Sequence, residues 1–244
     1  MATALVQYTA AAVSDCGRKR SSNEDAFGYS VKNGVYVLCD GMGGAAAGEV
    51  ASALAVEEFM HRLTHRTANA ALPALAEQAV VEANEVIYYR AQRDRKLNGM
   101  GTTCVALVVE ERRAWVLNVG DSRCYRLRNG RLEQITLDHS LVDEQVRLGR
   151  MTPSEALQSP LRNVITRALG THTDVAPDVF DLEAEPRDLF LLCSDGLTRE
   201  IDDSVIQSTL ALDLPLSELC SRLVGAANQA GGHDNITCLL VRAA

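Results

Sequence analysis

The acidic residues of this chain stand in short motifs whose residue types and spacing suit metal chemistry. Asp40, Asp121 and Asp195 each follow an apolar, strand-like run, directly or after one intervening residue. A carboxylate at a strand end can project into a cleft, because a neighbouring glycine lets the backbone turn sharply and approach a ligand. The motifs are Asn23-Glu24-Asp25, Asp40-Gly41-Met42-Gly43-Gly44, Gly120-Asp121-Ser122-Arg123, Ser194-Asp195-Gly196 and His233-Asp234-Asn235.

The chemistry of these acids points to hard cations. Carboxylates that converge on one cleft repel one another, and the repulsion raises their pKa unless cations hold them together. No His/Cys cluster with the spacing of a zinc site accompanies them. Oxygen ligands alone favour Mg²⁺ or Mn²⁺. The motifs therefore predict a metal-dependent hydrolase.

The composition is that of an ordinary globular protein. The chain has 244 residues, of which 47% are hydrophobic and 23% are charged, so it can bury a full core. Because we see no linker, repeat or low-complexity segment, we expect one domain over residues 1–244. The net charge of −8, with no basic stripe, argues against nucleic acid as a partner.

The cysteines and the apolar runs bear on the compartment. None of the seven cysteines forms a CxxC pair, and most of them sit inside apolar runs, as reduced buried thiols do. No apolar run reaches the length of about 18 residues that a membrane span needs, and the N-terminus has no signal-peptide pattern. We therefore expect a soluble cytoplasmic protein that does not contact a membrane.

The elements that must position the acids follow from the apolar periodicity. Consecutive strands, rather than strands alternating with single helices, favour antiparallel sheets with helices packed outside. Residues 138–170 are polar and broken by Gly149, Pro153 and Pro160, which predicts a small flap of short helices. We expect strands at 4–13, 25–31, 34–39, 102–109, 113–119, 123–128, 178–183, 188–193 and 235–241, and helices at 45–66, 73–94, 202–210 and 215–229.

In the order of its motifs the chain resembles the PPM (PP2C-type) protein serine/threonine phosphatases in their bacterial form. The resemblance implies an α+β fold. It is a four-layer αββα sandwich of two mostly antiparallel sheets flanked by helix pairs, with a flap at about 139–176. Besides the acidic motifs, the matching stations are Ser14-Asp15-Cys16-Gly17-Arg18, Gly101-Thr102-Thr103, Asp138-His139-Ser140, Arg162-Asn163-Val164-Ile165-Thr166-Arg167-Ala168-Leu169-Gly170 and Gly231-Gly232-His233-Asp234-Asn235-Ile236-Thr237.

The resemblance also implies the metal ligands. Asp40 corresponds to the residue that bridges two Mn²⁺ or Mg²⁺ ions. Asp195 and Asp234 would complete the protein ligands of the first ion. The carbonyl of Gly41 would serve the second ion, with Glu24 acting through water.

Three further roles are carried over in the same way. Asp121, together with Asp195, would hold a third and weaker ion of the kind seen in bacterial members. Arg20, four residues before Glu24, would grip the substrate phosphate. Asp25 would orient the site by hydrogen bonding.

The activity that the resemblance implies is hydrolysis of phosphoserine and phosphothreonine. A water that bridges two cations is hydroxide-like near neutral pH and would attack phosphorus in line. The cations and Arg20 would stabilise charge on the phosphoryl oxygens, and a guanidinium suits that task because it bonds two oxygens at once. The expected partners are phosphoproteins and a cognate Ser/Thr kinase whose action the enzyme opposes. We expect a monomer.

The general acid is the part of the family pattern that this chain lacks. Other members, chiefly eukaryotic ones, carry His at the position of Met42, and many bacterial members carry His where this chain has Ala45. Neither side chain can donate a proton. A metal-bound water would protonate the leaving alkoxide instead, and we expect His233 to be a solvent-facing loop residue. The general acid stays unassigned.

Three other functions fit the sequence less well. Cys193 and Arg199 match the Cys-x5-Arg loop of cysteine-dependent phosphatases, but Asp195 would bring negative charge into that loop and nothing nearby lowers the pKa of the thiol. A non-enzymatic phosphatase-like scaffold is disfavoured because every metal-site acid is present. A two-metal nuclease is disfavoured by the acidic balance and the absence of a basic groove.

Overall fold

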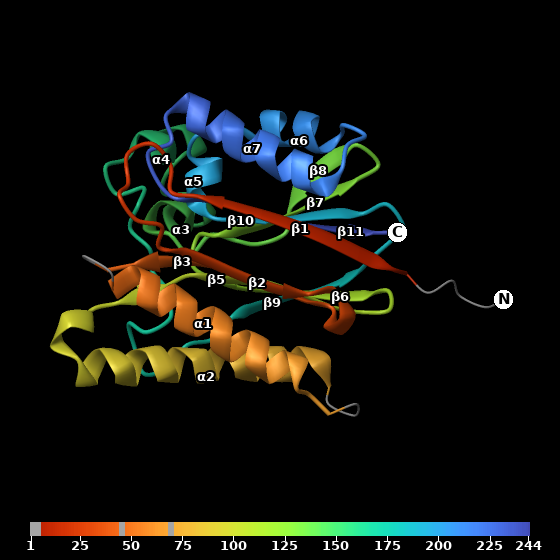
Figure 1. The fold of residues 1–244 in the computed structure, drawn as a ribbon. Helices are drawn as coiled ribbons and strands as arrows, with labels where there is room; N and C mark the ends of the chain where they lie inside the picture. Colours follow the sequence, from red (N-terminus) through yellow and green to blue (C-terminus); the bar gives the residue numbers. More distant parts are fainter. Residues whose placement is uncertain (1–5, 44–46, 68–70) are drawn as a thin grey trace.

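Two antiparallel sheets stack face to face, and a pair of helices covers the outer face of each sheet (Figure 1). The structure is a computed structural model that describes residues 6–43, 47–67 and 71–244. The arrangement confirms the fold class predicted from the sequence.

The strands of the first sheet run in the order β1 (Tyr8–Asp15), β11 (Ile236–Ala243), β10 (Leu189–Cys193), β7 (Arg123–Arg128) and β8 (Arg131–Gln134). The second sheet has the order β2 (Asp25–Ser30), β3 (Val35–Met42), β5 (Cys104–Glu110), β6 (Arg113–Val119) and β9 (Asp178–Glu183), with β4 (Gly101–Thr102) beside the end of β3. The helices are α1 (Ala47–Thr64), α2 (Leu72–Arg93), α3 (Leu141–Arg147), α4 (Pro153–Gln158), α5 (Asp195–Thr198), α6 (Asp203–Leu210) and α7 (Leu216–Ala230), and the 3-10 turns are η1 (Val31–Asn33) and η2 (Arg95–Leu97).

The central strands are apolar on both faces because each sheet is covered by helices on one face and by the other sheet on the other face. In β3, Val35, Val37 and Cys39 join the buried cluster beneath α1 and α2. Tyr36 and Leu38, which alternate with them, join the cluster between the two sheets. A third cluster fills the space between the first sheet and the helices α6 and α7. Three apolar layers therefore separate four layers of secondary structure.

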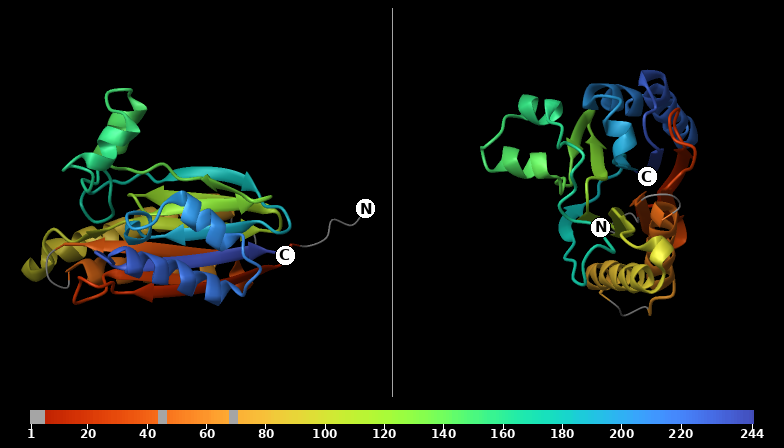
Figure 2. Two further views of the ribbon diagram at one scale, coloured as in Figure 1. Left: turned by 90° about the horizontal axis from the view of Figure 1, so that it is seen from above. Right: turned by 90° about the vertical axis from the view of Figure 1, so that its left-hand side faces the viewer.

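Helices α3 and α4 stand out from the body of the molecule, within the segment predicted as the flap (Figure 2). His139 fixes the base of this segment. The Gly120 N–H donates to its Nδ1 at 3.0 Å, which leaves its Nε2 to donate to Asp178 at 3.2 Å. Burial lowers the pKa of His139 and keeps the imidazole neutral. The residue therefore has a structural task.

The element bounds differ from the sequence prediction in a few places. Strand β1 lies at Tyr8–Asp15 rather than at 4–13, because its register against β11 carries it to Asp15, and positions 4 and 5 lie outside the described residues. The predicted helix start at 45 and 46 also lies outside them. Strand β8 and helix α5 were missed, since one is a short polar edge strand and the other a single turn.

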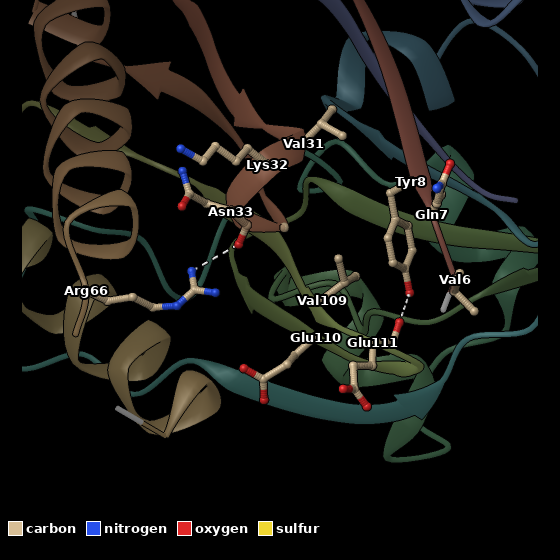
Figure 3. A pocket seen from close by; sticks show the side chains of 11 residues that line it. Val6, Gln7, Tyr8, Val31, Lys32, Asn33, Arg66, Val109, Glu110 and Glu111 are labelled. Atoms are coloured by element: carbon tan, nitrogen blue, oxygen red, sulfur yellow. Dashed lines mark hydrogen bonds between the residues drawn. The ribbon is translucent and has the colours of Figure 1, made fainter. Parts of the chain in front are cut away.

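The end of the sandwich where β1 begins carries a shallow hollow of ≈ 470 Å³ (Figure 3). Arg66 donates to the Asn33 carbonyl at 3.0 Å, and the Tyr8 hydroxyl donates to the Glu111 carbonyl at 2.9 Å. These contacts tie the end of α1 and the start of β1 to neighbouring turns. None of the predicted site acids lines this hollow.

None of the helices within the described residues combines the length and the apolar character that a membrane crossing requires. All seven cysteines are free, and all except Cys16 are buried, as predicted.

Asn84 of α2 is a buried polar residue that ties this helix to the last part of the flap segment. Its amide nitrogen donates to the carbonyls of His172 and Thr173, each at 3.1 Å. Its amide oxygen accepts from the Gly170 N–H at 2.8 Å. One side chain thus satisfies three backbone groups of a segment that has no strand or helix of its own.

We predict that Asn84→Ala lowers the free energy of unfolding by about 1–3 kcal/mol, because the buried Gly170 N–H and two partly buried carbonyls lose their partner. Glu85→Ala is the matched control: Glu85 is exposed in the same helix, and its loss should change the free energy by less than about 0.5 kcal/mol. Urea denaturation measures both values. Equal stability of the two variants would contradict the assignment.

Candidate active site

The predicted acids meet in a pocket of ≈ 480 Å³ at the end of the sandwich where β1 and β3 finish. Of the site residues predicted from the sequence, Asp25 and Asp121 do not line the pocket wall, and the other six do. The lining residues are Arg20, Glu24, Asp40, Gly41, Met42, Gly43, Asn163, Ile165, Asp195, Arg199, Asp234 and Asn235.

Asp40 is held through its backbone by Thr102, the last residue of β4, and by Thr103, which follows it. The Asp40 N–H donates to Oγ1 of Thr103 at 2.9 Å, and the Asp40 carbonyl accepts from the Thr102 hydroxyl at 2.9 Å. Thr103 Oγ1 also lies 2.7 Å from the Ser122 hydroxyl, which belongs to the turn that leads into β7. The carboxylate of Asp40 is therefore free to face the pocket while its main chain is fixed.

Gly41 allows the chain to pass close to α1. A Cβ atom on Gly41 would lie 2.1 Å from the Gly48 carbonyl oxygen and 2.6 Å from that of Glu24. No side chain fits there, which accounts for glycine after Asp40 and brings Glu24 beside the pocket.

Asp25 lies beneath the pocket, directly across β2 and β3 from Asp40. Its Oδ2 accepts hydrogen bonds from the Ser194 hydroxyl at 2.8 Å and the Thr237 hydroxyl at 2.6 Å. Both donors belong to the first sheet, so Asp25 joins the two sheets at this end. Burial raises the pKa of Asp25 to about 6, and the two hydroxyl bonds limit the rise.

Asp234 pairs with Arg20. The Arg20 Nη2 lies 2.8 Å from Oδ2 of Asp234, and the arginine side chain is 50% exposed. The next residue, Asn235, holds the loop that carries Glu24, because its amide oxygen accepts the Glu24 N–H at 2.8 Å and its amide nitrogen donates to the Ser22 carbonyl at 2.8 Å. One short segment therefore places a predicted ligand, a predicted phosphate contact and Glu24 together.

Asp195 and Asp121 both pair with the guanidinium group of Arg199. Asp195 opens α5, and Arg199, the residue directly after this helix, pairs with its carboxylate. The Arg199 Nη2 is also 3.3 Å from Oδ2 of Asp121. Both acids are buried, and Oδ1 of each has no hydrogen-bond partner among the described residues.

The pKa values of several pocket acids are raised, because these acids are buried and lie close to one another. Burial raises the pKa of Asp40 well above its usual range, and the charges of Asp25 and Asp195 raise it further. Burial and the nearby Asp121 raise the pKa of Asp195, against the opposing effect of Arg199. Burial is also the main cause of the raised pKa of Glu24 and of Asp121.

The donor set fits hard cations. Within residues 6–43, 47–67 and 71–244, no three His, Cys, Asp or Glu side chains already stand as a ready-made metal site. Arg20 and Arg199 instead bond oxygens of Asp234, Asp195 and Asp121. The unpaired buried oxygens and the raised pKa values mark a group of carboxylates that calls for more positive charge than two guanidinium groups supply. Oxygen donors of this kind match Mg²⁺ or Mn²⁺.

No imidazole lines the pocket in the described part of the chain. Met42 stands on its wall, and Ala45 lies outside the described residues. The Nδ1 of His233 is 2.7 Å from Oε1 of Glu200, and its side chain is largely exposed, in line with the loop position that we expected.

The structure also excludes a cysteine nucleophile at Cys193. The thiol is fully buried within β10, and burial raises its pKa to about 12. Arg199 does reach the pocket, but it bonds carboxylates there.

Sequence reasoning missed several residues that build this site. Arg199 follows Asp195 by four residues, a helical spacing, but no helix was predicted at this position, so the spacing gave no signal. The hydroxyl donors and Asn235 stood inside the quoted motifs, yet nothing in their spacing says which carboxylate or backbone group they bond. The missed residues are Thr102, Thr103, Ser122, Asn163, Ser194, Arg199, Asn235 and Thr237.

Comparison with known proteins places this geometry in a family. The family model of protein phosphatase 2C matches residues 14–240. The serine/threonine phosphatase stp of Listeria innocua is 38% identical over 233 residues, which cover 93% of this chain and 92% of that protein. The crystal structure of the Mycobacterium tuberculosis serine/threonine phosphatase PstP/Ppp is 39% identical, with a TM-score of 0.91 over 98% of this chain and 99% of that one.

A second solved structure, the catalytic domain of the phosphatase PstP in complex with two manganese ions, is 38% identical with a TM-score of 0.89 over 98% of this chain and 99% of that one. The resemblance predicted from the order of the motifs is therefore confirmed. This chain belongs to the protein phosphatase 2C family.

Proposed function

We propose that this protein hydrolyses phosphoserine and phosphothreonine esters in proteins with the help of Mn²⁺ or Mg²⁺. The observation that supports this most strongly is the convergence of Asp40, Asp195 and Asp234 on one pocket, where buried carboxylate oxygens lack partners. The names of the relatives and the two manganese ions of the PstP structure agree with it.

In this proposal Asp40, Asp195 and Asp234 hold the two core ions, with the Gly41 carbonyl and, through water, Glu24. When bound, the ions supply a nucleophilic water at neutral pH and stabilise charge on the phosphoryl oxygens. Asp121, together with Asp195, would hold a third and weaker ion; in this structure both acids bond the Arg199 guanidinium.

The protein's own groups then bind and orient the phosphate. Arg20 sits half-exposed at the mouth of the pocket and can turn from Asp234 towards a phosphoryl group, which it would hold by two parallel hydrogen bonds. Thr102 and Thr103 fix the Asp40 backbone by hydrogen bonds, and Asp25 joins the ends of the two sheets. Because no histidine lines the described pocket, the proton for the leaving alkoxide would come from water.

The cellular role follows from this chemistry. We propose a monomeric, single-domain cytoplasmic enzyme over residues 1–244 that opposes a Ser/Thr kinase and does not act on nucleic acid or at a membrane. The relatives named serine/threonine phosphatase support the substrate class, and the acidic pocket and net charge of −8 disfavour a polyanionic nucleic acid.

Phosphate release from a phosphothreonine peptide tests the proposal. We expect no turnover after dialysis against EDTA and recovery on addition of Mn²⁺ or Mg²⁺, because an all-oxygen site binds such ions reversibly. Asp195→Asn should lose at least about a hundredfold in kcat, since it removes charge from two ion sites together. The control is Asp181→Asn on β9, an exposed acid outside the pocket, which should keep wild-type turnover. Full activity in EDTA would refute the metal dependence.

Arg20→Ala separates phosphate binding from metal binding. Its loss should lower kcat/KM by roughly ten- to a hundredfold, mostly through KM, because a charge-assisted bidentate contact is removed. Mn²⁺ affinity should not weaken, since Arg20 competes with a cation for Asp234.

Arg18→Ala is the matched control for this variant. The Arg18 N–H donates to the Gly232 carbonyl at 2.7 Å, and its side chain is exposed, so kcat/KM should stay within about twofold of the wild type. Peptide kinetics and Mn²⁺ titration on both variants give the answer. A crippled Arg18→Ala, or an Arg20→Ala that mainly loses Mn²⁺, would show that the phosphate contact lies elsewhere.

A further inference from the structure

Four exposed basic residues lie within seven positions of the chain, where α2 ends and η2 begins. They are Arg90, Arg93, Arg95 and Lys96. Their side chains form no ion pair or hydrogen bond with any described residue. Asp94 is the only acid among them, and its carboxylate accepts the backbone N–H of Lys96 at 3.0 Å. We call residues 90–96 the basic rim.

The basic rim is a local excess of positive charge, because four of its seven residues are basic and one is acidic. Acids outnumber bases by 32 to 24, so partners for arginine are not scarce. Arg62 on the neighbouring helix, for example, pairs with Glu82, and Arg222 pairs with Glu218. The dipole of α2 favours cations in its last turn, which accounts for Arg90 and Arg93. That effect fades beyond the last turn, so Arg95 and Lys96 need another reason.

The basic rim is joined directly to the wall of the active site. The Leu97 carbonyl of η2 accepts the Met100 N–H at 3.0 Å. Met100 packs beside Gly43, where an added Cβ would lie 3.1 Å from the Met100 Cα. The next residues form β4, which pairs with Gly41 and Met42 of the pocket wall. In Figure 1 the end of α2 lies at the same end of the molecule as the end of β3.

We propose that the basic rim binds acidic side chains of the phosphoprotein segment whose phosphoryl group occupies the active site. The inference rests on the proposed function and names the substrate class more closely. The basic rim attracts acidic side chains, because guanidinium groups can bond carboxylates bidentately. An extended peptide advances about 3.3 Å per residue, so the position of the acids relative to the phosphothreonine sets how far from the pocket they bind.

Peptide kinetics test this inference. One phosphothreonine peptide carries three glutamates before the phosphothreonine, and a second carries three glutamates after it. Each has a control peptide with glutamine at the same three positions. The wild type should show a KM roughly three- to tenfold lower for one glutamate peptide than for its glutamine partner. The preference should vanish at about 0.5 M NaCl, where exposed charges are screened.

Two variants with the same change of net charge locate the effect. Arg95→Glu/Lys96→Glu should abolish or reverse the preference, while Lys32→Glu/Arg131→Glu, with both charges exposed on other faces, should retain it. Both variants should hydrolyse p-nitrophenyl phosphate within about twofold of the wild type, which shows that the fold and the pocket are intact.

Equal KM values for glutamate and glutamine peptides in the wild type would overturn the inference. A preference that survives in Arg95→Glu/Lys96→Glu would also overturn it, because the acidic residues would then bind elsewhere. Failure of the proposed function looks different: in that case no peptide is hydrolysed, the glutamine peptides included.

Discussion

Mutual repulsion among buried carboxylates is the constraint on which this structure depends. The ends of strands from both sheets bring Asp25, Asp40 and Asp195 together, and the pKa of each is raised by burial. Such a group is costly to keep ionised without compensating positive charge. Arg20 and Arg199 supply part of that charge, and the oxygens that remain without partners describe a site built for cations.

The rest of the fold resists this repulsion in two ways. Between the sheets the contacts are apolar over most of their length. At the active-site end they become polar, where Ser194 and Thr237 of one sheet bond Asp25 of the other, and Thr103 bonds Ser122 across the same gap. Hydroxyl bonds are short and directional, so they fix the position of the acids more closely than apolar packing does. The hydrophobic layers provide the stability that allows such a group to exist.

The strands, the family and most of the site residues could be predicted from the sequence, whereas the strand register and the side-chain partners could not. The apolar runs before Asp40, Asp121 and Asp195 predicted strands whose ends meet, and the order of the motifs predicted the family. Register is a different matter. That Asp25 lies across from Asp40 depends on pairing between strands, which a list of apolar positions does not determine.

The partners of charged side chains at helix ends were the second feature that could not be predicted from the sequence. Arg199 was weighed as part of a cysteine loop, yet one turn of helix places it on two carboxylates. Along the sequence the basic rim appears as scattered arginines next to an acid. Only the structure shows that Arg95 and Lys96 have no side-chain partner among the described residues, and that the chain after them pairs with the pocket wall through β4.

Thermal unfolding with and without Mn²⁺ tests the central claim, that the acids repel one another until cations bind. Asp40→Asn keeps the shape of the side chain and removes one repelled charge. In EDTA at neutral pH its Tm should lie above that of the wild type, because Asp40 has no cationic partner among the described residues. Saturating Mn²⁺ should raise the Tm of the wild type by several degrees and that of the variant by little, since a ligand stabilises only the state that binds it. A variant that is less stable than the wild type in EDTA, yet gains as much from Mn²⁺, would contradict the account.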